Sequence, residues 1–213
     1  MTREDIEQLR GLMQRCFRYD GPYRLSSGRS SKYYYDGKGA TQDPPTNWLI
    51  GRALVDVVLE SGAEAVGGLE IGAIFIADAV GMVAHVERGV SLPTFTVRKE
   101  AKSHGTKSRI SQANMLDGSP LLRPERKVAI VDDVITTGGS IQTAIDAVKG
   151  LGCVVTTVIA LVERHESNGA LRGQDFPVLR LFYTDEEGRL FVDPEFVRRA
   201  EEAAQSRLLP LSS

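Results

Sequence analysis

Several features that mark common classes of protein are scarce or absent in this sequence. The chain of 213 residues has only two cysteines, Cys16 and Cys153, and three histidines, none in a metal-ligand spacing. No apolar run approaches the roughly 20 residues of a membrane span, and the beginning, MTREDIEQLR, lacks the apolar core of a signal peptide. Acidic residues (28) and basic residues (26) nearly balance. We therefore expect a cytoplasmic protein with free thiols, no structural metal site, no membrane contact and no nucleic-acid partner.

Short apolar runs alternate with helical patterns through most of the chain. Strand-like runs rich in β-branched residues are predicted at 63–69, 92–98, 127–133, 153–164 and 176–184. Helices are predicted at 2–17, 43–62, 72–89, 139–152 and 193–207. This alternation predicts one α/β domain over residues 1–213, with a mostly parallel sheet covered by helices on both faces. Residues 1–40, with a short hairpin, are expected to form a small cap outside the sheet.

The stretch VAIVDDVITTGGS, from Val128 to Ser140, joins a predicted strand to the start of a helix. Ligands of open α/β sheets bind at the carboxyl ends of the strands, which is where Asp132 and Asp133 stand. The threonines, the glycines and the helix N-terminus offer hydroxyl and N–H donors to a phosphate. The acids would repel that phosphate, so we expect them to accept hydrogen bonds from ribose hydroxyls. A ligand with a 5-phosphate and free ribose hydroxyls satisfies both halves.

Other phosphate-binding motifs do not fit this stretch. A Walker loop needs a lysine after its glycines, and neither this segment nor GLEIG at 68–72 has one. No Gly-x-Gly-x-x-Gly pattern follows a predicted strand, which disfavours a dinucleotide site. The remaining alternative is a helix-capping turn that carries two surface acids.

The same stretch resembles the 5-phosphoribosyl-1-diphosphate (PRPP) signature of type I phosphoribosyltransferases. That resemblance implies the fold of the family, in which helices flank a mostly parallel sheet with a small N-terminal cap. It also implies that Asp132 and Asp133 hold the ribose hydroxyls. The 5-phosphate would be bound by the loop that follows, which consists of Thr136, Thr137, Gly138, Gly139 and Ser140.

A second stretch, VRKEAKSHGTKSR from Val97 to Arg109, is rich in basic residues. As a charge pattern it fits a solvated loop, and it lacks the aromatic residues of a nucleic-acid patch. Its chemistry suits a mobile clamp on a pyrophosphate leaving group, and we expect such a loop at 98–112. The stretch resembles the catalytic loop of orotate phosphoribosyltransferases, in which the loop often serves the neighbouring subunit of a homodimer. That resemblance assigns the pyrophosphate to Arg98, Lys99, Lys102 and His104.

Further segments match the same family in the same order. LSSGRSSKYYYDGK at 25–38 resembles the segment whose aromatic side chains flank the base. GGLEIGA at 67–73 resembles the loop that contacts pyrophosphate through its backbone. LVERHESNG at 161–169 resembles the strand end whose arginine binds the orotate carboxylate. The implied orotate-binding residues are Ser26, Tyr34, Tyr35, Thr136 and Arg164.

Some positions depart from the family pattern. Many members have lysine where this chain has Ser26, and proline is common where it has Phe75. The segment at 111–124 is longer and has less glycine than the usual segment after the loop. These departures bear on the fit of the base and on loop closure, whereas the PRPP motif is unaffected.

The resemblance implies transfer of the 5-phosphoribosyl group from PRPP to orotate, which gives orotidine 5′-monophosphate and pyrophosphate in pyrimidine biosynthesis. Mg²⁺ would be bound mainly through substrate oxygens, without a direct protein ligand. Two alternatives stay open. A phosphoribosyltransferase for another base would present no carboxylate to Arg164, and a PRPP-sensing regulator without turnover would not need the basic loop.

Overall fold

The computed structural model describes residues 1–24, 30–100, 109–111, 114–167, 169–171 and 173–208. Within them, a six-stranded sheet has the order β10-β9-β8-β7-β5-β6. Neighbouring strands are parallel except for the antiparallel pair of β10 and β9. This confirms the predicted α/β fold with a mostly parallel sheet. The strands are β5 Ala65–Leu69, β6 Thr94–Val97, β7 Lys127–Ile135, β8 Val154–Glu163, β9 Val178–Thr184 and β10 Leu190–Val192.

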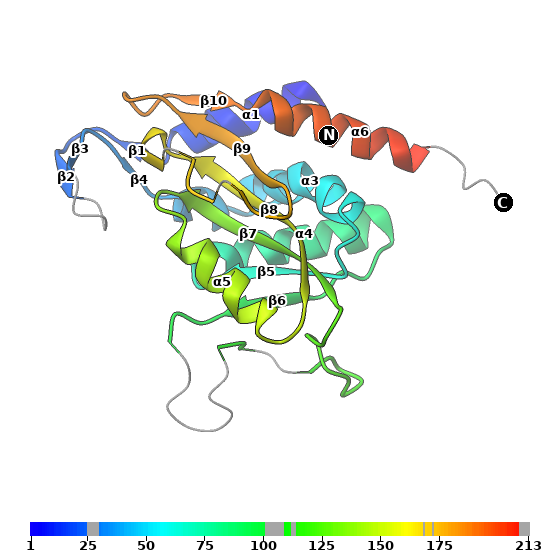
Figure 1. The fold of residues 1–213 in the computed structure, drawn as a ribbon. Helices are drawn as coiled ribbons and strands as arrows, with labels where there is room; N and C mark the ends of the chain where they lie inside the picture. Colours follow the sequence, from blue (N-terminus) through cyan, green and yellow to red (C-terminus); the bar gives the residue numbers. More distant parts are fainter. Residues whose placement is uncertain (25–29, 101–108, 112–113, 168, 172, 209–213) are drawn as a thin grey trace.

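Helices cover both faces of the sheet (Figure 1). Successive side chains of β7 alternate between two cores, because Ala129 and Val131 pack in the core of α1, α3, α4 and α6, while Val128 and Ile130 pack in the core of α5. Burial on both faces explains why the strand is a continuous apolar run. The helices are α1 Arg3–Gln14, α2 Lys38–Thr41, α3 Pro44–Glu60, α4 Gly72–Arg88, α5 Gly139–Lys149 and α6 Pro194–Leu208, with the 3₁₀ turn η1 His165–Ser167.

Local sequence signals set several helix boundaries. Thr2 and Asp5 form a capping box at the start of α1, and Asp43 caps α3, which begins with prolines. Asp193 accepts hydrogen bonds from two N–H groups in the first turn of α6. Gly89 ends α4 in the left-handed conformation, with φ of 65°. None of the helices in the described residues is long and apolar enough to cross a bilayer.

The described part of the first forty residues adds no strand to the main sheet, although α1 packs in the core on one of its faces. It contains two small antiparallel ladders, in which β1 pairs with β4 and β2 with β3. The helix predicted at 2–17 is wrong at its end, because α1 stops at Gln14 and Phe17 lies in β1. The sequence did not predict β10, whose three residues are too few to show a period. The strands of this region are β1 Phe17–Arg18, β2 Tyr23–Arg24, β3 Ser30–Ser31 and β4 Tyr34–Tyr35.

Candidate active site

A polar cavity of about 490 Å³ opens where β5, β7 and β8 end. Its walls also include β4 of the N-terminal region and the first residue of α4, so it is bounded by segments far apart in the sequence. The lining residues are Arg24, Tyr34, Tyr35, Asp36, Gly37, Lys38, Leu69, Glu70, Ile71, Gly72, Lys99, Asp132, Asp133, Val134, Thr136, Ser140 and Arg164.

The cavity brings together most of the predicted site residues that the structure describes. Those that line it are Tyr34, Tyr35, Lys99, Asp132, Asp133, Thr136, Ser140 and Arg164. Described residues that do not line it are Arg98, Thr137, Gly138 and Gly139. Ser26, Lys102 and His104 lie outside the described residues. The sequence did not single out Arg24 or Asp36, and only the resemblance of GGLEIGA pointed to the wall from Leu69 to Gly72.

The acid pair lies at the centre of the cavity wall and is short of hydrogen-bond donors. Asp132 is only 5% exposed, and one of its oxygens accepts a hydrogen bond of 3.0 Å from the N–H of Asp133. Burial, together with the neighbouring Asp133 charge, raises the pKa of Asp132 well above its usual range. Burial also raises the pKa of Asp133. One buried and one partly buried carboxylate that resist ionisation suit a ligand that brings hydroxyl donors or a cation.

The N-terminus of α5 follows the acid pair and is open to an anion. No side chain caps this helix, and its N-cap residue, Gly138, has a φ of 76° that favours glycine. A Cβ at Gly138 would also lie 2.8 Å from a side-chain carbon of Leu171. The uncapped N–H groups and the hydroxyls of Thr136 and Ser140 therefore form a site that suits a phosphate.

The start of α4 packs directly against the acid pair. A Cβ placed on Gly72 would lie 2.7 Å from Oδ1 of Asp133 and 2.8 Å from Oδ1 of Asp132. Any side chain at this position would push the carboxylates aside. Glycine therefore allows the backbone of the 67–73 segment to approach the residues expected to hold the ribose.

Lys99 is the residue of the basic segment 98–109 that lines the cavity, and hydrogen bonds hold the backbone at Lys99 and at Arg98 before it. The Glu70 side chain accepts a hydrogen bond of 3.0 Å from the Lys99 N–H. The N–H of Arg98 donates to the carbonyl of Arg109 over 2.7 Å, and a bridge joins Val97 to the next residue of the returning chain. The two ends of the 98–109 segment thus meet beside the cavity. Lys99 also counteracts the rise in the pKa of Asp132.

Arg164 also lines the cavity, and its buried side chain is already engaged. Its backbone N–H donates to the carbonyl of Ile135 over 3.0 Å, which ties it to the end of β7. The side chain donates to Glu166 from Nε over 3.1 Å and from Nη2 over 2.8 Å. Nη2 also donates to Oγ of Ser31 over 2.8 Å, and the guanidinium lies 4.4 Å from the ring centre of Tyr33.

The two predicted base-flanking tyrosines face different environments. Tyr34 is 41% exposed and lies near Tyr23, with 5.5 Å between ring centres. Tyr35 is 6% exposed, and its hydroxyl is buried without a hydrogen-bond partner among the described residues. Burial and the Asp133 charge raise the pKa of Tyr35 well above its usual range. Its hydroxyl therefore stays protonated and available as a donor.

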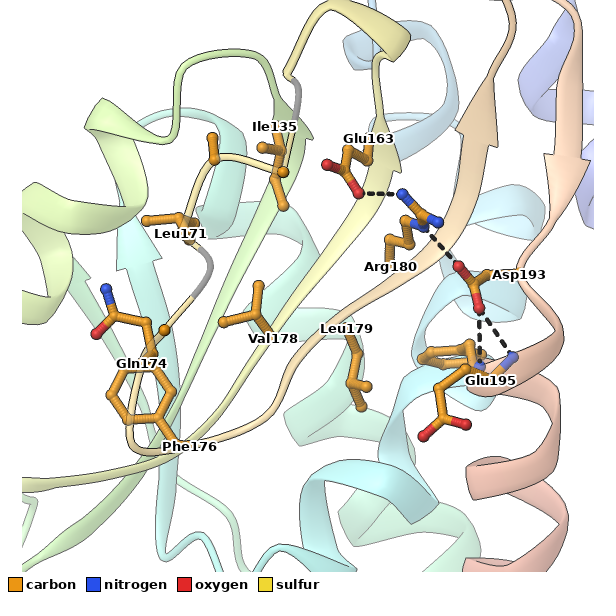
Figure 2. Close-up of a pocket in the computed structure, with 14 residues that line it drawn as sticks. Ile135, Glu163, Leu171, Gln174, Phe176, Val178, Leu179, Arg180, Asp193 and Glu195 are labelled. Atoms are coloured by element: carbon orange, nitrogen blue, oxygen red, sulfur yellow. Dashed lines mark hydrogen bonds and ion pairs between the residues drawn. The ribbon is translucent and has the colours of Figure 1, made fainter.

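A second cavity, of about 420 Å³, lies beside the end of β8 (Figure 2). No described residue lines both cavities. Figure 2 shows Arg180 between the carboxylates of Glu163 and Asp193, and both ion pairs are formed. Because Arg180 is engaged by both carboxylates and no predicted site residue is present, we assign the chemistry to the first cavity.

Comparison with known proteins agrees with this geometry. The model of the phosphoribosyl transferase domain family matches residues 68–185. The orotate phosphoribosyltransferase of Aquifex aeolicus is 38% identical over 165 residues, which are 77% of this chain and 85% of that protein. That of Nostoc is 41% identical over 147 residues, which are 69% of this chain and 67% of that protein.

Solved structures give the same assignment. The orotate phosphoribosyltransferase of Mycobacterium tuberculosis in complex with PRPP superposes with a TM-score of 0.62 at 28% identity, over 83% of this chain and 94% of that chain. The family model spans more than half of the sequence, and the relatives match over most of it. The chain therefore belongs to the orotate phosphoribosyltransferases, within the type I phosphoribosyltransferase family.

Proposed function

We propose that the polar cavity is the active site in which the phosphoribosyl group passes from PRPP to orotate. The chain is an orotate phosphoribosyltransferase, an enzyme of pyrimidine biosynthesis that forms orotidine 5′-monophosphate and pyrophosphate. The observation that supports the site most directly is the meeting of three groups in one cavity. These are the acid pair, the N-terminus of α5 and Arg164, which suit the ribose, the 5-phosphate and the orotate carboxylate.

PRPP is held by β7 and the turn after it. Asp132 and Asp133 accept hydrogen bonds from the ribose hydroxyls, which supply the donors that the buried carboxylates lack. The 5-phosphate binds the loop of Thr136, Thr137, Gly138, Gly139 and Ser140, where helix N–H groups carry partial positive charge.

The pyrophosphate leaving group binds the basic segment. Lys99 already faces the cavity, and Arg98, Lys102 and His104 are assigned the same role by the family resemblance. Charge grows on pyrophosphate as its bond to C1 breaks, so cationic side chains there stabilise the transition state more than the ground state. His104 supplies a hydrogen bond or a proton to the pyrophosphate, and an imidazole side chain can donate either.

The oxygen donors of this cavity fit the Mg²⁺ that the family uses with PRPP. Asp132 and Asp133 offer hard carboxylate oxygens whose ionisation a nearby cation would favour. Mg²⁺ would be held mainly by substrate oxygens beside these carboxylates, since no described group of three or more histidine, cysteine or acidic side chains forms a protein cage. When bound, Mg²⁺ neutralises charge on the pyrophosphate.

Orotate lies between the N-terminal strands and the end of β8. Arg164 binds its carboxylate, and Tyr34, Tyr35, Thr136 and Ser26 surround the ring. A ring nitrogen of orotate then forms a bond to C1 of the ribose as the bond from C1 to oxygen breaks. The bonding electrons leave with pyrophosphate, and the ring nitrogen releases its proton.

The assay that tests this function follows the loss of orotate absorbance in the presence of PRPP and Mg²⁺. We expect orotate to be consumed and pyrophosphate to appear in equal amount. If uracil or hypoxanthine reacts and orotate does not, the assignment of the base is wrong. If PRPP binds and no base reacts, the chain is a PRPP-sensing protein rather than an enzyme.

We also propose a cytoplasmic homodimer in which the basic segment of one chain serves the site of its partner. In that case Lys102→Ala and Asp133→Asn dimers are both poorly active, while a mixture regains activity because each hybrid has one intact site. A mixture with confirmed hybrids that stays at the average of the two variants would contradict the shared site.

A further inference from the structure

The arginine assigned above to the orotate carboxylate already has a carboxylate partner inside the protein. Glu166 meets it in a two-pronged contact, with hydrogen bonds of 3.1 Å to Nε and 2.8 Å to Nη2. The side chains of Arg164 and Glu166 are only 4% and 18% exposed. The pair is therefore shielded from water, and its attraction is stronger than that of a surface pair.

The remaining contacts leave only one end of the guanidinium for a ligand. The two N–H groups of Nη2 point to Glu166 and to Ser31, and Nε is used by Glu166. The ring of Tyr33 lies against the flat side of the guanidinium. No hydrogen bond joins Nη1 of Arg164 to another described residue. Among the described contacts, Nη1 is therefore the nitrogen left for the carboxylate of a ligand, because Nε and Nη2 are engaged.

Glu166 is charged at neutral pH and compensates Arg164. Burial acts to raise the pKa of Glu166, but hydrogen bonds from Arg164 and the arginine charge keep it below its usual value of 4.5. His165 also faces this carboxylate, with 3.2 Å between Nδ1 and Oε2. The free enzyme therefore presents a neutral ion pair, rather than a bare cation, to orotate.

We propose that Glu166 is a specificity-determining residue that occupies Arg164 as an internal counterpart of the substrate carboxylate. Orotate is then recognised through Nη1 of a neutralised arginine, and it binds less tightly than it would to an unpaired one. This inference rests on the assignment of Arg164 to orotate in the proposed function. Orotidine 5′-monophosphate keeps the same carboxylate, so Glu166 also weakens the binding of product and favours its release.

Removal of Glu166 should strengthen orotate binding, rather than weaken it, because the charge of Arg164 is buried. If Glu166 only oriented the guanidinium, its removal would weaken orotate binding. Ser31 and the Tyr33 ring would still hold the guanidinium plane, however, whereas its charge would lose the only carboxylate that pairs with it in the described residues. An uncompensated buried charge is costly. The ligand carboxylate would relieve that cost, so its binding would become stronger.

The test compares two nucleotides that differ only in the base carboxylate, orotidine 5′-monophosphate and uridine 5′-monophosphate. Binding of each is measured by calorimetry with the wild type and with Glu166→Gln. We expect Glu166→Gln to bind orotidine 5′-monophosphate about tenfold more tightly, a change of about 1.4 kcal/mol, with little change for uridine 5′-monophosphate. The preference between the two nucleotides therefore rises about tenfold. An unchanged or reduced preference overturns the proposal.

Matched variants separate this inference from the assignment beneath it. Glu163→Gln removes a carboxylate one residue from Arg164 that pairs with Arg180 instead, so the nucleotide preference should stay at the wild-type value. Arg164→Met should remove the preference for the carboxylate. If it does not, the assignment of Arg164 fails. If it does, and Glu166→Gln leaves the preference unchanged, only the role of Glu166 fails.

A second variant, which keeps the negative charge, keeps the proposal testable if Glu166→Gln does not fold. Glu166→Asp retains the charge, but it is one methylene shorter and cannot make the same two-pronged contact. We expect a smaller rise in preference, of about two- to threefold, because the arginine charge is less well compensated. A preference at or below the wild-type value in a folded Glu166→Asp protein would overturn the proposal.

Discussion

The proposed active site has two halves, one for PRPP and one for the base, and each buries a charged side chain in a different environment. Asp132 in the PRPP half is 5% exposed and Arg164 in the base half is 3% exposed. The aspartate has a like-charged neighbour and a raised pKa, whereas the arginine has a carboxylate, a hydroxyl and an aromatic ring around it. The PRPP half is thus incomplete until hydroxyl donors or a cation arrive, while the base half is complete before its ligand binds.

This difference teaches how each half can recognise its ligand. An incomplete site gains from any ligand that relieves its unfavourable charge, so binding there is strong. A site whose charge is already paired gains only from the contacts that remain open, so binding there is weaker. The comparison makes acid-to-amide changes informative, because the same chemical change should have opposite effects on stability in the two halves.

The largest effect is expected in the base half. Glu166→Gln should lower the free energy of unfolding by about 3 kcal/mol, because it leaves the Arg164 charge buried without its partner. Denaturant titration of the ligand-free protein measures this change. Glu201→Gln, at an exposed position of α6, serves as the control and should change stability by less than about 0.5 kcal/mol. Equal stability of Glu166→Gln and wild type would mean that the base half is not held together by this pair.

A backbone change in the PRPP half should have the next largest effect. Gly72→Ala places a methyl group within 3 Å of both acid side chains, as the positions of Oδ1 of Asp132 and Asp133 show. We expect PRPP binding to weaken about 10- to 100-fold, or about 1.4–2.7 kcal/mol, while the preference for orotate over uracil is kept. Gly11→Ala is a matched control, since a Cβ there meets nothing within 4 Å. Unchanged PRPP affinity in Gly72→Ala would show that the acids can shift without loss.

The smallest effect has the opposite sign. Asp132→Asn should raise the free energy of unfolding at neutral pH by about 1–2 kcal/mol, although it impairs PRPP binding. The folded protein raises the pKa of Asp132, so the ionised side chain lowers the stability of the fold. This loss of stability is absent below the usual pKa of 3.8, grows as the pH rises above it, and is complete above the folded pKa. The gain in Asp132→Asn should therefore shrink toward acid pH. Glu166, with a lowered pKa, should show the reverse, since its contribution is lost as pH falls.

Denaturant titration of wild type and Asp132→Asn, at pH values from below 3.8 to neutral, measures the difference between their free energies of unfolding. The difference between the two proteins removes the titration of all other groups, provided that these groups are unperturbed by the substitution. A variant less stable than the wild type at every pH would show that Asp132 is stabilised, rather than strained, in the free enzyme.

The PRPP half could be predicted from the sequence because its residues are contiguous. The segment from Val128 to Ser140 contains a strand, two acids and a helix start, and each of these has a local signal. The base half could be predicted only in part. Arg164 follows a recognisable strand, but Ser31 is 133 positions away from it in the sequence, and no local pattern joins the two.

Other features depend on register or on distant neighbours. The strand pattern implies that Tyr34 and Tyr35 point to opposite sides, but only the pairing of β4 with β1 decides that Tyr35 faces inward. The constraint on Gly72 comes from carboxylates about sixty residues further along the chain. The roles of Ser26, Lys102 and His104 stay predictions, as does the boundary of the 98–112 loop, because most of that segment lies outside the described residues.

The hydrogen bond from the Arg164 N–H to the Ile135 carbonyl links the two halves through the sheet itself. Asp132 lies in β7 and Arg164 directly follows β8, and the pairing of these two strands runs without a break in register from Ala129 to Ile135. The backbone distance between the proposed ribose-binding acid and the proposed orotate-binding arginine is therefore set by the sheet. Under the proposed function, this spacing sets how far the orotate carboxylate lies from the ribose.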